Sequence, residues 1–100
     1  MSRPRHPRRD ANHQAILDGC RALGMVVWDC SDLGGHVLDA VVFWRGRAVP
    51  VEIKMPGCEH DLTDGEIHGM RELSSVGAWP IVATCVEDVV RAFERSCNEG

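Results

Sequence analysis

The 100-residue sequence contains no apolar run long enough to cross a membrane as a helix. Its arginine-rich start is not followed by the apolar segment that a secretory signal peptide requires. It also has no internal repeat and no low-complexity tract. We therefore expect a cytoplasmic protein with no membrane partner and one domain with a single modest core, a size at which oligomerisation helps to complete a binding surface.

The cysteines also lack a pattern. They number five, are scattered, and form no Cys-x-x-Cys pair, so a zinc or disulfide framework is not expected. Cys58 and His60 are both metal-ligand types, but two residues do not make a site, and a turn is the simpler interpretation. Cys20 and Cys85 lie among apolar residues and are expected in the core.

Positive charge is scarce beyond the first nine residues. These carry +4, whereas the remaining residues, with seven basic and 15 acidic side chains, carry −8. A flexible arm suits contact with nucleic-acid phosphates, and a solubilising tail is the alternative. Its candidate nucleic-acid-binding residues are Arg3, Arg5, Arg8 and Arg9. The acidic remainder counts against nucleic-acid binding, because such domains usually present a basic footprint, although bound metal would cancel part of that charge.

The sequence does contain two β-rich apolar runs joined by a tight turn at Gly46, which indicates a β-hairpin. If the loop consists of two residues, Asp39 lies directly opposite Glu52. Lys54 then projects from the same face as Glu52, because strand side chains alternate. Both faces are otherwise largely apolar, which predicts a central hairpin with helices on both sides. A bulge at Pro50 would shift this register.

Opposed carboxylates repel each other, so the pairing of Asp39 with Glu52 requires compensation. A hard divalent cation held by both would provide it, and Mg²⁺ prefers carboxylate and water oxygens. Such an ion could activate a water and hold a phosphate, with Lys54 beside it. The alternative is an ordinary cross-strand salt bridge of Lys54, which contributes at most about 1 kcal/mol when exposed.

Before the hairpin, the pattern predicts a helix and then a strand. Asp10 is the expected N-cap of the helix and Gly24 its stop, and His13 is expected on the exposed face. Residues 25–29 form the expected first strand. The apolar stripe that should cover the sheet recurs at helical spacing: Ile16, Cys20 and Leu23.

After the hairpin, Thr63 and Glu66 form a capping box that opens a second helix, with Leu62 and Ile67 as its hydrophobic staple. A strand over residues 78–83 follows and is expected to be parallel to its neighbour, because a helical crossover precedes it. A second capping box opens the last helix, between Thr84 and Glu87.

These elements predict an α/β fold in the order helix, three strands, helix, strand, helix, with a mixed central sheet flanked by helices. The expected domain spans residues 10–95. A flexible basic arm at residues 1–9 precedes it, and a frayed tail at residues 96–100 follows.

Asp39 followed by Glu52-x-Lys54 on consecutive strands resembles the PD-(D/E)XK nuclease superfamily, with Leu38 where that motif usually has proline. Arg-Arg-Asp-Ala-Asn near the start, Gly-Gly before the hairpin and Leu-Thr after the lysine are similar to its small phage members. These are the stand-alone VRR-NUC type, related to Holliday-junction resolvases. The resemblance covers about residues 8–93 and implies a restriction-endonuclease-like core.

The resemblance implies an Mg²⁺-dependent DNA endonuclease of phage replication, recombination or repair, acting in the host cytoplasm, with Mn²⁺ as a second candidate ion. Asp39, Glu52 and the Ile53 backbone carbonyl would ligate one or two ions, and Lys54 would orient or deprotonate the attacking water. Branched or structured DNA is the implied substrate and a homodimer the implied assembly. Four further residues are candidate accessory groups near the site: Glu66, Asn12, Gln14 and His36.

Several features depart from the family pattern. Leu38 replaces the usual proline, the first helix lacks the glutamate that often joins the metal site, and Glu66 stands where a glutamine is common. These departures and the acidic domain leave an alternative open, a catalytically weak or inactive nucleic-acid-binding module of the same fold in a phage assembly. A nuclease directed at RNA or tRNA is a further alternative.

Overall fold

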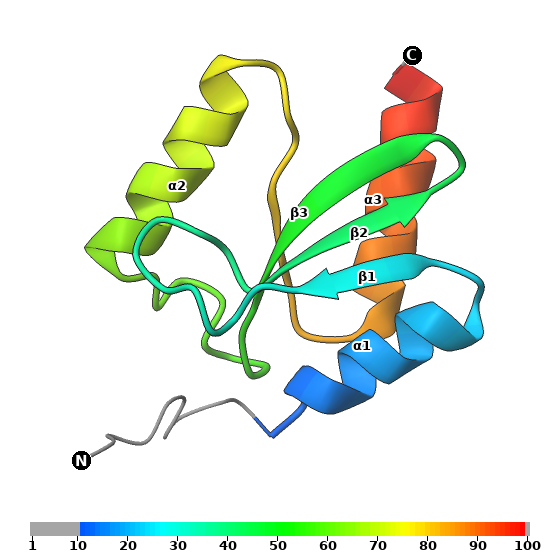
Figure 1. Ribbon diagram of the computed structural model, residues 1–100, viewed down its shortest axis with the longest axis horizontal. Coiled ribbons are helices and arrows are strands. Elements are labelled where there is room, and N and C mark those ends of the chain that lie inside the picture. The colour runs from blue at the N-terminus through cyan, green and yellow to red at the C-terminus, as the bar shows by residue number, and fades with distance from the viewer. Residues whose placement is uncertain (1–10, 100) are drawn as a thin grey trace.

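The computed structural model describes residues 11–99, and within them the chain forms three helices and one four-stranded mixed sheet in the predicted order (Figure 1). The elements are α1 (His13–Ala22), β1 (Val26–Asp29), β2 (Ala40–Trp44), β3 (Arg47–Ile53), α2 (Asp64–Ser75), β4 (Ile81–Ala83) and α3 (Val86–Glu99). None of these helices has the length and apolar character needed to cross a bilayer. The basic arm at residues 1–9 and the expected cap Asp10 lie outside the described residues.

The sheet has the strand order β1-β2-β3-β4, so the hairpin of β2 and β3 is central, as predicted. Trp44 pairs with Arg47, and the regular antiparallel register continues past Pro50 without a bulge. Arg45 and Gly46 form the two-residue turn with φ values of 53° and 74°. Two positive φ values are the mark of the type I′ turn, whose twist matches that of the flanking strands. β4 is parallel to β3, also as predicted.

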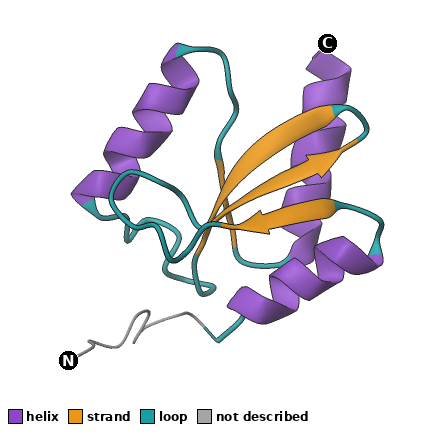
Figure 2. Ribbon diagram, viewed as in Figure 1, coloured by secondary structure: helices purple, strands orange, loops and turns teal. Residues whose placement is uncertain are grey.

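Helices α1 and α3 pack together on one face of the sheet and enclose the core (Figure 2). Val42, Val49 and Val51 are each at most 3% exposed and point to this face from the central strands. The fully buried Phe93 of α3 and Leu17 of α1 close the core from the other side. Burying side chains of this size contributes about 1.5–3 kcal/mol each, which makes this layer the main source of stability.

Helix α2 lies over the opposite face and covers it only in part. Its single buried residue is Gly69, and it encloses a cavity of about 300 Å³ with the loop before β2 and the hairpin. That cavity is lined mainly by Val37, Leu38, Val41, Pro50 and Leu73. Trp28 of β1 remains 61% exposed on this face, with its ring edge-on to Phe43 at 4.8 Å. The prediction of helices on both faces therefore holds, but the second layer is incomplete.

The ends of α1 differ from the prediction. The N-cap is Asn12, which makes no side-chain capping hydrogen bond, and Gly24 (φ 93°) ends the helix as predicted. His13 is only 3% exposed, although we expected it on the exposed face. It precedes Ile16 and Leu17 by three and four residues and therefore continues the buried stripe. Leu23 is 50% exposed because it lies beyond the last helical residue, so its place in that stripe was wrong.

The boundaries near the C-terminus also differ. The expected capping box between Thr84 and Glu87 was wrong: α3 begins two residues after Thr84, and Thr84 contacts the Asp88 side chain, to which it only donates. The Thr84 N–H donates to Asp88 Oδ2 at 2.9 Å, and the Thr84 hydroxyl donates to the same oxygen. The last strand is shorter than predicted, and the backbone stays helical to Glu99, where a frayed tail was expected.

Two glycines allow the loop before β2 to lie directly on α2. A Cβ on Gly69 would lie 2.0 Å from the carbonyl oxygen of His36, and one on Gly65 would lie 2.7 Å from the carbonyl oxygen of Gly35. Both neighbours are backbone atoms, which cannot rotate away as a side chain would. The close approach of loop and helix therefore requires glycine at both positions.

We predict that Gly69→Ala destabilises the protein by on the order of 1–3 kcal/mol, because the added methyl group forces the His36 backbone away from α2. Helix propensity alone would predict the opposite sign, since alanine is favoured over glycine in a helix by about 1 kcal/mol. Urea unfolding measures the difference, with the exposed Ser74→Ala on the same helix as the control. A Gly69→Ala variant as stable as the parent would show that the loop does not pack closely against α2.

Candidate active site at the open end of the hairpin

Asp39 and Glu52 meet where the hairpin opens, as the register predicts. The Asp39 N–H donates to Glu52 Oε1 at 3.3 Å, and the Ile53 N–H donates to Asp39 Oδ2 at 2.9 Å. Each carboxylate thus accepts a hydrogen bond from the backbone of the opposite strand. The two acids lie on the face covered by α2, because Ala40 and Ile53, which alternate with them, point into the core.

Lys54 joins these acids from the end of β3. Its Nζ lies 3.8 Å from Glu52 Oε2 and 3.0 Å from Glu66 Oε1. The side chains of Lys54 and Glu66 are only 15% and 20% exposed, and Glu52 is 3% exposed. The structure therefore brings together the three predicted catalytic residues and one of the four accessory candidates.

Glu66 reaches this cluster from the first turn of α2, where it also completes the predicted capping box. The Glu66 N–H donates to the Thr63 hydroxyl at 3.1 Å, and Glu66 Oε1 accepts from the Thr63 N–H at 2.9 Å. The same oxygen contacts Lys54. The capping box therefore aims the Glu66 carboxylate at the end of β3, so capping and membership of the site are compatible roles.

The cluster shifts the pKa values of Glu52 and Glu66 in opposite directions. Burial, a hydrogen bond with Glu66 and the negative charge of Asp39 raise the pKa of Glu52 to about 9, against the opposing effect of Lys54. Burial alone would also raise the pKa of Glu66, but hydrogen bonds from Glu52, the Thr63 backbone and Lys54 outweigh it, so the pKa is lowered. At neutral pH without a bound cation, Glu52 therefore keeps its proton and donates to the Glu66 carboxylate.

Asn12 lies beside the site but is engaged with the backbone. Its Nδ2 donates to the Lys54 carbonyl at 3.0 Å and to the Thr84 carbonyl at 2.9 Å. These bonds tie α1 to the chain just beyond β3 and β4, which is the segment that carries Lys54. Asn12 thus lies against the backbone of the candidate site, and its side-chain amide donates to two backbone carbonyls.

Gln14 and His36 lie outside the cluster. The Gln14 amide donates to Asp18 Oδ1 at 2.9 Å on the exposed face of α1. His36 faces α2, where its ring stacks on His68 with centroids 4.0 Å apart and its Nδ1 lies 3.6 Å from Glu72 Oε1. The sequence analysis missed this second cluster. The i,i+4 spacing of His68 and Glu72 was visible in the sequence, but the approach of His36 depends on tertiary structure.

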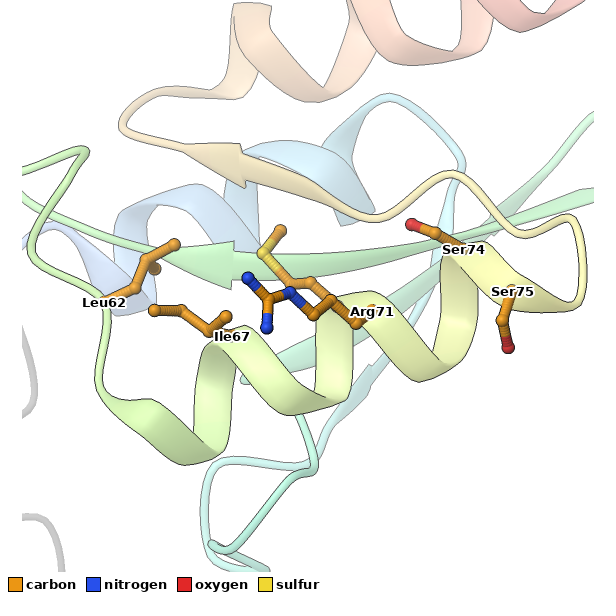
Figure 3. A pocket seen from close by; sticks show the side chains of 6 residues that line it. Leu62, Ile67, Arg71, Ser74 and Ser75 are labelled. Atoms are coloured by element: carbon orange, nitrogen blue, oxygen red, sulfur yellow. The ribbon is translucent and has the colours of Figure 1, made fainter.

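Two other features are separate from the candidate active site. Cys58 lies in a turn, its N–H donating to the Met55 carbonyl at 2.9 Å, which confirms the simpler interpretation. An open groove runs along α2 (Figure 3) and is lined by none of the catalytic candidates. Leu62 and Ile67, the expected staple, both line this groove.

We predict that the metal-free protein loses stability as pH rises from about 4.5 to about 9. Over this window the folded protein keeps the Glu52 proton while the unfolded chain, with an ordinary pKa of 4.5, has lost it. Glu52→Gln is neutral throughout, so in chelator-treated buffer it should melt at least about 4 °C above the parent at pH 8.5. At pH 5 the two should differ little.

Glu66 has the opposite effect on the pH dependence of stability. Its pKa is lowered in the folded protein, so the stability that it contributes is lost as pH falls below the unfolded value of 4.5.

The control for the Glu52→Gln experiment is Glu94→Gln, which removes an exposed carboxylate from α3 and should leave the pH profile unchanged. Equal melting-temperature changes for Glu52→Gln at pH 5 and pH 8.5 would show that Glu52 is not the titrating group.

The geometry is thus the buried carboxylate of Glu52 opposed by the partly buried Asp39, with a lysine and a third carboxylate at their side. Its parts come from the hairpin and from the start of α2. Comparisons with protein-family models, with curated proteins and with solved structures find no match for this chain.

Proposed function

We propose that this chain is an Mg²⁺-dependent deoxyribonuclease of the PD-(D/E)XK type that hydrolyses phosphodiester bonds in branched or structured DNA. The observation that carries the proposal is the interlocked pair Asp39 and Glu52, with the Lys54 ammonium on the same face. Two carboxylates beside one lysine are what the motif requires, and here one of the two, Glu52, is buried. An exposed salt bridge of Lys54 would explain neither the presence of two opposed acids nor the burial of Glu52.

The donor set fits a hard divalent cation. Asp39 and Glu52 present carboxylate oxygens, and the like charges that now favour a protonated Glu52 would both be stabilised by an ion between them. The Ile53 carbonyl is the proposed third ligand. When bound, Mg²⁺ supplies Lewis-acid stabilisation of the phosphate oxygens and lowers the pKa of a water.

The coordination has to include water. Within residues 11–99, the carboxylates of Asp39, Glu52 and Glu66 are not gathered tightly enough to count as a three-ligand cluster. Mg²⁺ tolerates this well, since it usually keeps several waters and uses only one or two protein carboxylates. The proposal therefore assigns Asp39 and Glu52 to the ion and leaves Glu66 to position Lys54.

Lys54 is the residue proposed to handle the nucleophile. It is the only lysine in the sequence, and its ammonium is held at 3.0 Å by Glu66 and at 3.8 Å by Glu52. This placement lets it donate a hydrogen bond to an attacking water or to a phosphate oxygen of the scissile group. Glu66 keeps the ammonium beside the carboxylate pair, so we propose it as a positioning residue.

The order of elements and the parallel pairing of β3 with β4 also support a restriction-endonuclease-like core. DNA as substrate, a homodimer as the working assembly and phosphate contacts from the N-terminal arginines are parts of the same proposal.

A second candidate function is a nucleic-acid-binding module with a weakened site. One observation favours it: the Lys54 ammonium is already paired with Glu66 at 3.0 Å, and Glu52 prefers its neutral form. A lysine neutralised by a neighbouring acid is a poorer partner for phosphate. Leu38, which is 4% exposed, occupies the position of the usual proline.

We predict Mg²⁺-dependent cleavage of branched DNA that a chelator abolishes. Asp39→Asn and Lys54→Ala should each reduce the rate by about 10²-fold or more, because each removes a charged group from the reacting centre. The matched control is Asp61→Asn, an exposed acid in the loop before α2, which should retain activity within about twofold. Gel assays on linear, flapped and four-way substrates measure the rates.

The same panel should include RNA and a tRNA to separate the deoxyribonuclease from an RNA-directed enzyme. If highly purified protein binds DNA but cuts no DNA form with Mg²⁺ or Mn²⁺, the binding module replaces the nuclease. Cleavage that persists in both Asp39→Asn and Lys54→Ala would point to a contaminant and remove the proposed site.

A further inference from the structure

A second group of potential metal ligands lies between the loop before β2 and the exposed side of α2. His36 Nδ1 is 3.6 Å from Glu72 Oε1, and His68 Nε2 is 3.5 Å from Glu72 Oε2. One ligand atom from each of the three side chains lies within 4.8 Å of the other two. Among the described side chains of residues 11–95, no other group of three His, Cys, Asp or Glu meets this spacing.

The backbone places these three groups together. His68 and Glu72 are four residues apart on α2 and therefore share one face of the helix. His36 is held against that face because its carbonyl lies over Gly69 and the preceding Gly35 carbonyl lies over Gly65. The loop thus rests on the helix backbone, and the imidazole stacks on His68 at a centroid distance of 4.0 Å.

The spacing suits a small transition-metal ion. Metal–nitrogen and metal–oxygen bonds of about 2.0–2.1 Å in tetrahedral geometry place neighbouring ligand atoms roughly 3.4 Å apart. The two histidine–glutamate distances of 3.6 and 3.5 Å are already close to this value. The side chains are 53–61% exposed, so small rotations can complete the geometry without repacking a core.

The ligand types distinguish this cluster from the carboxylate pair. Two imidazoles and one carboxylate form a donor set that favours Zn²⁺ over Mg²⁺, because imidazole nitrogen is a softer ligand than oxygen. Three protein ligands leave one tetrahedral position for water. Glu72 also contributes the negative charge that partly balances the ion.

We propose that His36, His68 and Glu72 form a Zn²⁺ site that clamps the loop before β2 onto α2. The loop leads directly to Leu38 and Asp39, and the first turn of α2 carries Glu66, so the site joins two segments that build the candidate active site. The proposal of a Zn²⁺ site depends only on these three ligands. It does not depend on the chain having nuclease activity.

Zn²⁺ titration of the full chain against a chromophoric chelator, with the thiols kept reduced, tests the proposal. We expect one ion per chain and an unchanged oligomeric state. His36→Ala, His68→Ala and Glu72→Gln should each weaken the affinity at least about tenfold. The matched control is His60→Ala, which removes an exposed histidine near Cys58 and should leave the affinity unchanged.

Cobalt substitution identifies the ligands independently. The expected Co²⁺ complex shows visible bands of a four-coordinate nitrogen and oxygen site and no thiolate charge-transfer band. A thiolate band, or loss of binding in His60→Ala, would place the ion at the cysteines and overturn the proposal. So would one ion shared by two chains, or unchanged affinity in His36→Ala and His68→Ala. Circular dichroism of each variant confirms that these exposed substitutions leave the fold intact.

Discussion

The burial of Glu52 directly across from Asp39 is the constraint on which the rest of the site depends. A buried carboxylate is costly unless it is neutralised or paired, and a second acid on the opposing strand adds repulsion. The structure offsets this in three ways: a backbone N–H donates to each acid, Lys54 approaches Glu52, and Glu52 keeps its proton by bonding Glu66. A hydrophobic pair would be simpler to bury, so the acids call for a functional explanation.

The hairpin can hold these acids because one of its faces packs in the core and the other presents Asp39 and Glu52. One face is committed to the core with α1 and α3, which holds β2 and β3 in place and prevents a slip of register. The tight turn at Arg45 and Gly46 fixes the same register from the other end, and the Arg45 guanidinium lies 4.1 Å from the Trp44 ring centre. The face with the acids therefore carries less of the packing that stability requires.

The parts that could be predicted from the sequence are those that depend on local chemistry. The turn determines the pairing of Trp44 with Arg47, and counting from it places Asp39 beside Glu52. The first capping box depends only on Thr63 and its third neighbour. What could not be predicted depends on how distant segments meet: the contact of Glu66 with Lys54, and the approach of His36 to His68 and Glu72. Local reasoning failed at His13, because the buried stripe of α1 was predicted to begin one turn too late, and at Asp88, because the start of α3 was misplaced.

Helix α2 contributes to both proposed sites, and its position is determined least by apolar burial. Only Gly69 is buried on it, so its place follows from the loop that rests on Gly65 and Gly69 and from polar contacts at Glu66 and Glu72. Polar contacts of this kind contribute little each and exchange readily with ligands. A phosphate that takes over Lys54 would release Glu66, and an ion held by Glu72 would fasten the same helix further along. The incomplete second layer of this fold thus leaves α2 held mainly by polar contacts, while the core face keeps the hairpin fixed.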